Sequence, residues 1–318
     1  MRGNYFRTLL ILLVAGCASL NTKAQDAYRI YLEPDGWSIG TNFGTTDLWG
    51  DVGTKTLIDH YVNSKYFDKV VFMGGAFGRY TMHPCLSVKF GVNYGTVYAS
   101  DEWNTDKAVY APVQGSDAYQ RYARQQKAKT TIFEGNVLME FSPLRYNPET
   151  IRANRRGQIV FGAGLGYFHF TPMSTVALGT KFVNIYNLHI EGDGFGPGFP
   201  KSYSLWQLCI PMSVSYRWDL GKHINIGLEY MYRKTFTDYL DGVSGKYIDK
   251  AEYAKHLSPS EAATAALIAD KAFYFNRAQP NVAGNIRGNA SDKDAYSSLC
   301  FTLYYKLLSR QDKWWQQF

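Results

Sequence analysis

The side chains that could perform catalysis are spread along the chain rather than grouped in a known motif. None of the 6 histidines stands in an HExxH pattern, which would place two metal ligands on one helix face, or near a GxSxG nucleophile turn. Folding could bring His169, His189 and Asp193 together, but the same holds for many other polar triples. We therefore predict that the protein is not an enzyme.

Acidic residues and cysteines suggest no cofactor either. Asp238 and Asp241 could share a cation, but without a third ligand motif such acids more often cap or pair with other groups. The sequence EGDGFG at residues 191–196 matches neither a phosphate loop nor a calcium loop, and it predicts a flexible, turn-rich loop. The cysteines of the mature chain are widely spaced and form neither a CxxC pair nor a disulfide framework: Cys85, Cys209 and Cys300. No metal or cofactor is expected.

The most regular stretch of the chain runs from His223 to Ser244. In its first part apolar and polar side chains alternate with the period of two that is typical of a β-strand. One face carries Ile224, Ile226, Leu228, Tyr230 and Tyr232, and the other carries Asn225, Gly227, Glu229, Met231 and Arg233. Such a strand fits a barrel that faces lipid on one side and a narrow polar lumen on the other.

Seven further segments repeat this alternation, more weakly in the Gly-rich segment 70–80, which predicts eight strands in all. They are 37–44, 70–80, 85–97, 131–141, 158–170, 205–218 and 295–307. Their polar faces combine Gly and Ser with charges of both signs, and buried charges have to be paired. We predict a lumen charge network of seven residues: Lys89, Glu134, Glu140, Arg217, Glu229, Arg233 and Lys306.

The predicted fold class is all-β, an eight-stranded antiparallel transmembrane barrel of the outer-membrane type. The connections alternate between short or moderate periplasmic turns and long extracellular loops, as in outer-membrane barrels. The long loops are 45–68, 99–130, 172–204 and 241–294. Both termini are then expected on the periplasmic side. Alternation alone also fits a soluble barrel with its apolar face inward, as in lipocalins, and this is the rival fold.

Two local signals add detail. Pro211 lies in the middle of a predicted strand, where it costs a ladder hydrogen bond, and it is expected to mark a bulge. The sequence SPSE at 258–261 is a capping box with proline at the first helical position. It predicts a short extracellular helix that extends to about Phe273.

The first 24 residues have the features of a secretory signal peptide. Arg2 and Arg7 precede an apolar run and then small residues. Cleavage before Gln25 competes with a lipobox that would leave Cys17 lipidated, and either route exports the protein. Beyond the signal no apolar run approaches the roughly 18 residues of a membrane-spanning helix. The expected domains are a signal peptide (1–24), a barrel (25–308) and a periplasmic C-terminal tail (309–318).

Composition narrows the partners. The net charge is +7, and 16% of the residues are aromatic, 25 of them tyrosine, which concentrates where apolar and wet environments meet. No basic stripe is interleaved with stacking aromatics, so nucleic acid is not an expected partner. Basic and aromatic residues occur together in the 142–156 turn and in the tail: Arg145, Arg152, Arg155, Arg156, Trp314 and Trp315. They form either an interfacial belt or a docking surface for a periplasmic protein.

The segment that follows the alternation carries a specific motif. Its core, TFTDYLD, resembles the signature of the PorG-like outer-membrane barrels of the Bacteroidota type IX secretion system. The core residues are Thr235, Phe236, Thr237, Asp238, Tyr239, Leu240 and Asp241. Weaker matches occur at 37–40, at 210–211 and at 287–289, whereas Gly242 replaces an acid that is usual in the family.

The resemblance implies a non-enzymatic structural component that anchors periplasmic ring proteins, similar to PorK and PorN, to the outer membrane. It does not imply a conducting pore. An eight-stranded barrel agrees with this independently, because side chains fill its interior. The alternative is a stand-alone outer-membrane barrel that acts as a surface adhesin or small-solute binder through its long loops.

Overall fold

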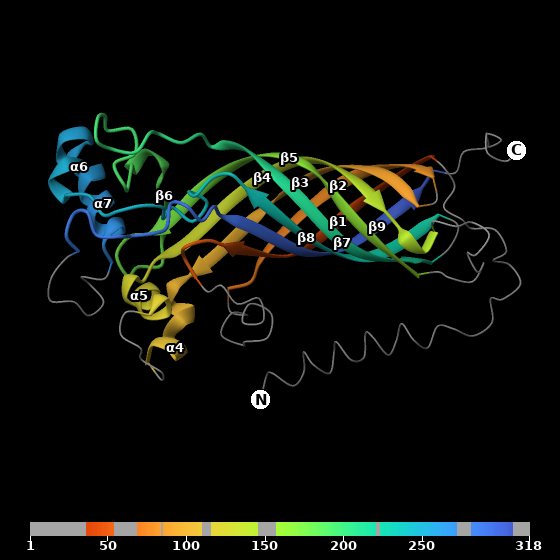
Figure 1. Cartoon of the computed structure of the whole chain (residues 1–318), viewed down its shortest axis with the longest axis horizontal. Coiled ribbons are helices and arrows are strands. Elements are labelled where there is room, and N and C mark those ends of the chain that lie inside the picture. The colour runs from red at the N-terminus through yellow and green to blue at the C-terminus, as the bar shows by residue number, and fades with distance from the viewer. Residues whose placement is uncertain are drawn as a thin grey trace, which may run out of the picture.

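The computed structural model describes residues 36–53, 69–83, 85–109, 116–145, 157–220, 223–271 and 281–307 (Figure 1). Among these residues, no helix is both long and apolar enough to cross a membrane. The predicted signal peptide (1–24) and tail (309–318) lie outside the described residues, as do Arg152, Arg155, Arg156, Trp314 and Trp315. Arg145 is the last residue of the short helix η2 (Pro143–Arg145).

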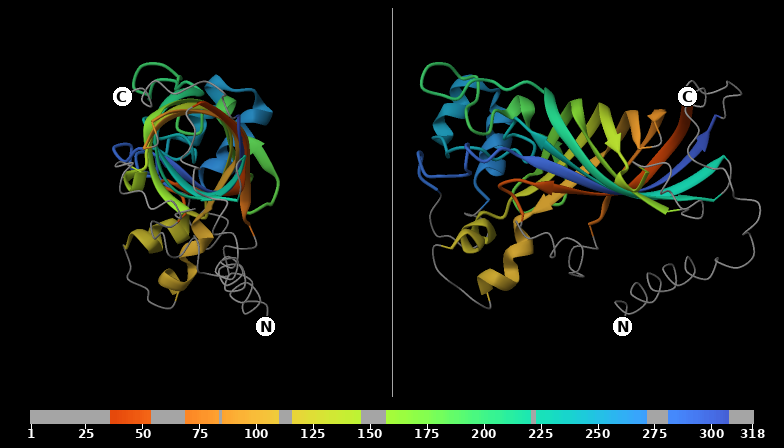
Figure 2. Two further views of the ribbon diagram at one scale, coloured as in Figure 1. Left: turned by 90° about the vertical axis from the view of Figure 1, so that its right-hand side faces the viewer. Right: turned by 45° about the vertical axis from the view of Figure 1, so that its right-hand side comes forward.

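Eight antiparallel strands close into a barrel, seen end-on in the left view of Figure 2. Each strand pairs with its neighbour in the ring, and the pairing of β4 with β5 completes the closure. The barrel strands are β1 (Gly36–Trp49), β2 (Val71–His83), β3 (Leu86–Ser100), β4 (Lys127–Phe141), β5 (Gly157–Thr175), β7 (Trp206–Asp219), β8 (Ile224–Thr235) and β9 (Ala295–Lys306). The predicted fold class is confirmed, although several strands are longer than predicted. A short extra strand, β6 (Phe182–Asn184), pairs with the end of β5.

The two faces of the strands have opposite exposure. On β8, Ile224 and Leu228 are 47% and 41% exposed, whereas Asn225, Glu229 and Arg233 are buried. Large apolar side chains are exposed in the same way on the other strands, among them Trp37, Phe90, Phe133, Leu165 and Phe301. A continuous apolar outer surface of this kind is suited to lipid and would be an aggregation hazard in water. The lipocalin-like alternative is therefore wrong, and the protein is an outer-membrane-type barrel.

The two ends of the barrel are built differently. At one end, called here the turn end, the N–H of Leu307 donates to the carbonyl of Trp37 at 2.8 Å. At this end only a few residues separate β2 from β3 and β7 from β8. The opposite loop end carries the long connections and, within the described part of the chain, the α-helices (Figures 1 and 2). These are α4 (Thr105–Val109), α5 (Asp117–Arg124), α6 (Lys250–His256) and α7 (Pro259–Ala269), with the short helices η1 (Asp101–Asn104) and η3 (Tyr186–Leu188).

The two local predictions have different outcomes. Pro211 causes no bulge: it pairs with Arg233 of β8, and the register between β5 and β7 is the same on either side of it. The β5–β7 ladder is interrupted only opposite residues 210–211, where proline offers no N–H. The predicted helix does form as α7, with the Ser258 capping box, but it ends at Ala269 rather than near Phe273.

Candidate functional site

Ion pairs fill the barrel interior, beginning at the turn end. Glu140 of β4 lies at the centre of the first layer. Its carboxylate accepts a hydrogen bond from Nε of Arg79 at 2.7 Å and lies 2.6 Å from Nη2 of Arg217. The hydroxyl of Ser87 donates to the same carboxylate at 3.0 Å. Two buried cations thus share one buried anion, an arrangement that is stable only while all partners are present.

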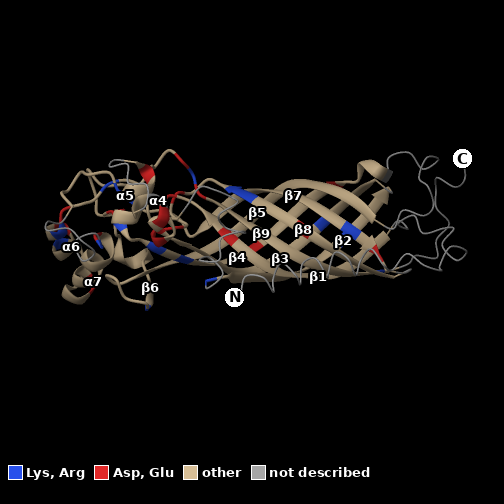
Figure 3. Cartoon of the chain, turned by 90° about the horizontal axis from the view of Figure 1, so that it is seen from below, with Lys and Arg blue, Asp and Glu red and all other residues tan. Residues whose placement is uncertain are grey.

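Two further pairs continue this filling toward the loop end. Nζ of Lys89 donates to both carboxylate oxygens of Glu229, at 2.7 and 2.8 Å. Nε of Arg233 donates to Glu134 at 3.0 Å, and the phenol of Tyr296 donates to the same carboxylate at 3.0 Å. Figure 3 shows charged residues at separate positions along strands that are otherwise uncharged. Each of these buried charges therefore lies against an opposite charge.

The structure places all seven residues of the predicted lumen network inside the barrel, each with an oppositely charged partner. The last of them, Lys306, pairs with Asp219 at 3.2 Å. Sequence reasoning missed Asp219 and Arg79. Arg79 could have been placed inside the barrel, because it lies two residues beyond Phe77 and therefore on the same, inward face of β2. The many glycines of β2 obscure this alternation. Its guanidinium also lies over the ring of Tyr304, 4.6 Å from the centroid.

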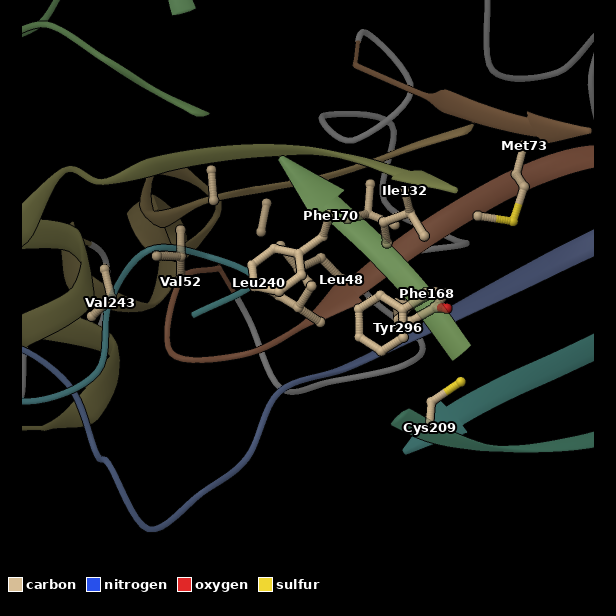
Figure 4. Packing of buried hydrophobic residues seen from close by; sticks show 13 residues of the cluster. Leu48, Val52, Met73, Ile132, Phe168, Phe170, Cys209, Leu240, Val243 and Tyr296 are labelled. Carbon is tan, nitrogen blue, oxygen red and sulfur yellow. The ribbon is translucent and has the colours of Figure 1, made fainter. Parts of the chain in front are cut away.

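Beyond the ion pairs, apolar side chains close the loop end of the barrel (Figure 4). This apolar plug consists of Leu48, Val52, Met73, Val97, Ala99, Ala128, Ile132, Phe168, Phe170, Cys209, Leu240, Val243 and Tyr296. The ring of Tyr296 meets that of Phe168 edge-on at 5.6 Å. The prediction of a polar lumen is therefore wrong for this end. The available signal was a pair of aromatic residues, Phe168 and Phe170, on the inward face of β5.

The TFTDYLD motif begins at the last residue of β8 and folds over the plug. The hydroxyl of Thr235 donates to the carbonyl of Asp294 at 2.5 Å and lies 3.2 Å from the carbonyl of Thr237. The N–H of Leu240 donates to Oδ2 of Asp294 at 2.8 Å, and the Leu240 side chain is part of the plug. Phe236 is exposed. Because Asp294 directly precedes β9, these bonds fasten the start of the β8–β9 connection to its end.

Other motif residues fasten this connection to different loops. The carboxylate of Asp241 accepts from the N–H of Val243 and from that of Val52 in the β1–β2 connection, both at 2.8 Å. The ring of Tyr239 stacks on Tyr203 with the centroids 4.1 Å apart. The capping role expected for Asp241 is thus seen in the structure. Among the described residues, no group of His, Cys, Asp or Glu has the geometry of a metal site.

Carboxyl groups accumulate beneath the motif. A Cβ built on Gly50 would meet oxygens of Asp241 and Asp294, each at 2.5 Å, so these two carboxyl groups lie close together. Burial raises the pKa of Asp241 to about 7 and that of Asp238 to about 8, and neighbouring carboxylates add to both shifts. Burial and the same neighbours also raise the pKa of Asp294. Asp238 and Asp241 are therefore partly protonated near neutral pH.

Two buried arginines connect the remaining loops. Nη1 of Arg287 donates to Glu191 at 2.6 Å, and Glu191 also accepts from two main-chain N–H groups of the β8–β9 connection. Arg124 of α5 donates to Asp101 at 2.8 Å and to the carbonyl of Arg287 at 2.7 Å. The prediction of a flexible loop at 191–196 is wrong for Glu191, which is buried and central. We call the joined loops, residues 50–53, 101–126, 191–193 and 236–294 where described, the cap.

The residues considered for catalysis do not form a triad. Nδ1 of His189 lies 3.1 Å from Oδ2 of Asp193. His169 lies on β5, and its ring packs edge-on against Trp206 with the centroids 4.9 Å apart. The structure therefore links only two of the three residues, and it gives no support to a catalytic role for them.

A scan against protein-family models and a search of curated proteins find no match to this chain. Among solved structures it is similar to Ail, the attachment invasion locus protein of Yersinia pestis in complex with the heparin analogue sucrose octasulfate (11% identity, TM-score 0.35, covering 85% of this chain and 98% of that chain). It is also similar to Neisserial surface protein A, with 7% identity and a TM-score of 0.37, covering 86% of this chain and 97% of that chain. A third similar structure is the outer membrane protein OprG from Pseudomonas aeruginosa, with 11% identity and a TM-score of 0.36, covering 87% of this chain and 98% of that chain. The fold assignment above rests on strand register and the exposed apolar face, independently of these likenesses.

Proposed function

We propose that the protein is a non-enzymatic, non-conducting component of the outer membrane that anchors the periplasmic ring of a type IX secretion system. The observation that carries the proposal is the closed interior, with ion pairs along the barrel and the apolar plug at the loop end. A barrel filled in this way provides an anchor in lipid but no passage for a polypeptide. The resemblance of the TFTDYLD motif supports the type IX assignment.

The proposed ring contact is at the turn end, which faces the periplasm in this proposal. The connection from β4 to β5 leaves the barrel there, and β9 ends there. The sequence places Arg145, Arg152, Arg155, Arg156, Trp314 and Trp315 in these segments. Guanidinium groups bind carboxylates bidentately, so the matching surface on PorK- and PorN-like ring proteins is an acidic one.

Charge reversal tests this contact. Arg152, Arg155 and Arg156 are replaced together by Glu in the full-length protein, and a tagged pull-down from detergent-solubilised envelopes of the native host is analysed by mass spectrometry. We expect wild type to recover ring proteins and the variant to lose them, while its folded barrel remains in the membrane. The matched control reverses three exposed lysines in loop-end connections: Lys181, Lys201 and Lys246.

Two results contradict the proposal. Unchanged ring recovery by the arginine variant refutes the contact, and recovery of the barrel alone by wild type, even after crosslinking, refutes the anchor. Planar-bilayer recordings provide a separate check, since we expect the purified barrel to show no conductance steps. Deletion of whole loops is a poor test, because residues of the long connections also build the plug and the cap.

A stand-alone surface adhesin or small-solute binder is the second candidate. The cap favours it, because its loops are joined by buried bonds into a preformed surface at the end away from the proposed ring contact. Under this alternative the pull-down recovers the barrel alone, and Arg287→Ala, which disconnects the cap, abolishes binding at the cell surface. Under the anchor proposal, Arg287→Ala leaves ring recovery unchanged.

A further inference from the structure

An open cleft of about 590 Å³ lies in the cap, separate from the ion pairs of the barrel interior and from the apolar plug. One wall is α5, which contributes the exposed Gln120, and the other is the 281–289 segment. Buried residues form the floor, among them Arg121, Arg124 and Tyr247. The volume falls within the range of roughly 300–1,000 Å³ that is usual for small-molecule sites.

Main-chain bonds hold the second wall in place. The N–H of Tyr247 donates to the carbonyl of Asn285 at 2.9 Å, and the N–H of Gly284 donates to the carbonyl of Tyr247 at 2.8 Å. Gly284 has a positive φ of 90°, which the tight turn at this wall requires. Nη1 of Arg121 fastens α5 to the carbonyl of Gly50 at 3.2 Å. The cleft is therefore preformed, which lowers the entropic cost of binding.

The cations of the cleft are already neutralised. Each of the three lining guanidinium groups holds a carboxylate, and the pairs are Arg121–Asp117 at 2.9 Å, Arg124–Asp101 at 2.8 Å and Arg287–Glu191 at 2.6 Å. An anionic ligand would have to compete with these carboxylates. An apolar ligand would find little to contact, because Tyr247 and Ile286 are the apolar side chains among the described lining residues.

The lining is rich in neutral amide side chains instead. They are Gln120, Asn281, Asn285 and Asn289. Asn281 also donates to Asp270 at 2.6 Å, and Asn289 accepts from the hydroxyl of Ser291 at 2.7 Å; one such bond does not use up the hydrogen-bonding capacity of a carboxamide. A carboxamide both donates and accepts hydrogen bonds, and so does a hydroxyl group. We propose that the cleft binds a neutral saccharide. A free oligosaccharide and the sugar part of a surface glycolipid share this chemistry. The proposal concerns the loop end and holds with or without a ring contact at the turn end.

The test uses the full-length protein in lipid nanodiscs. The probes are an array of short neutral hexose oligosaccharides, heparin as an anionic comparison, lipopolysaccharide from the native host and the polysaccharide released from that lipopolysaccharide. Asn285→Ala removes an exposed amide, and Gln120→Trp fills the mouth of the cleft. Asn187→Ala is the matched control because it removes an exposed amide outside the cleft, within η3. We expect wild type and control to bind the same neutral saccharide. Asn285→Ala should weaken binding about tenfold, and Gln120→Trp should abolish it.

Binding of intact lipopolysaccharide but not of its free polysaccharide identifies a glycolipid as the source, and equal binding of both identifies the sugar alone. The proposal is overturned if no neutral saccharide binds, if heparin binds more tightly than every neutral probe, or if both cleft variants bind like wild type. Folding of each variant is checked by its gel mobility before and after heating. Gln120→Ala replaces Gln120→Trp if the larger side chain prevents folding, and it should weaken binding as Asn285→Ala does.

Discussion

Replacing Glu140 by Gln tests whether the barrel interior is dry and fully paired. The Glu140 carboxylate lies 2.7 Å from Arg79 and 2.6 Å from Arg217, and all three side chains are buried. Glutamine has nearly the same shape but no charge, so two buried guanidinium groups lose the anion that they share. The substitution therefore removes electrostatic compensation while leaving the packing almost unchanged.

The expected decrease in the free energy of unfolding depends on how many buried cations lose their partner. Removing one partner of a buried ion pair typically costs about 3–5 kcal/mol, and the shared position of Glu140 places its variant at about 5 kcal/mol. Glu229→Gln affects only Lys89 and should cost about 3 kcal/mol. Glu102, which is exposed, pairs with the partly buried Lys127, and solvent screens this pair, so Glu102→Gln should cost less than about 1 kcal/mol.

The assay is urea unfolding of the barrel in lipid vesicles, followed by tryptophan fluorescence, which yields the free energy of unfolding for each variant. We expect the loss to decrease from Glu140→Gln through Glu229→Gln to Glu102→Gln. Adding Arg79→Gln to Glu140→Gln should recover part of the loss, because one of the stranded charges is removed. A Glu140→Gln barrel within about 0.5 kcal/mol of wild type would mean that water reaches these charges. The closed interior, and the non-conducting role inferred from it, would then be refuted.

Three further predictions concern the cap and the strands. Because the pKa values of Asp238 and Asp241 are raised, the folded cap retains protons that the unfolded cap releases, and its stability should fall as pH rises from about 4 to 8. Asp238→Asn should flatten this trend. The measurement is amide hydrogen exchange of residues 236–244, corrected for the intrinsic exchange rates. Protection that increases with pH would contradict the assignment. Gly44→Ala places a Cβ against the main chain of β9 and should cost about 3 kcal/mol or prevent folding, whereas Gly135→Ala meets nothing within 4 Å and should be nearly neutral in the same urea assay. Thr235→Val removes the hydroxyl that donates to the carbonyl of Asp294. It should increase amide exchange in the cap by one to two orders of magnitude, about 1–3 kcal/mol, without changing ring recovery in the pull-down. Loss of the ring proteins would show that the motif itself takes part in the contact.

The barrel could be predicted from the sequence because lipid imposes a local rule. Every second residue of a strand must be apolar over most of its length, and β8 shows this between Ile224 and Tyr232. The same rule sends the intervening residues inward, so Glu229 and Arg233 could be assigned to the interior without knowledge of their partners. Arg79 was not assigned to the interior, because glycines occur on both faces of β2 and obscure the alternation of apolar and polar residues.

The plug and the cap follow no such rule. Their bonds join residues far apart in the chain: Arg287 to Glu191 across 96 positions, and Val52 to Asp241 across 189. No periodic pattern signals such contacts, and Glu191 in particular lies in a glycine-rich segment that is typical of a flexible loop. These hydrogen-bond partners meet only because closure of the barrel brings the loops together at its mouth.

This difference changes what the TFTDYLD motif indicates. Thr235, Leu240 and Asp241 point into the protein and fasten the β8–β9 connection over the plug. The ring contact is proposed at the turn end, on residues outside the motif. A sequence signature that includes such residues indicates a shared way of closing the barrel mouth, because their bonds lie within the protein whatever the barrel contacts. It follows that the motif supports the architecture strongly and the partner only indirectly, and that the partner has to be tested where the arginines are.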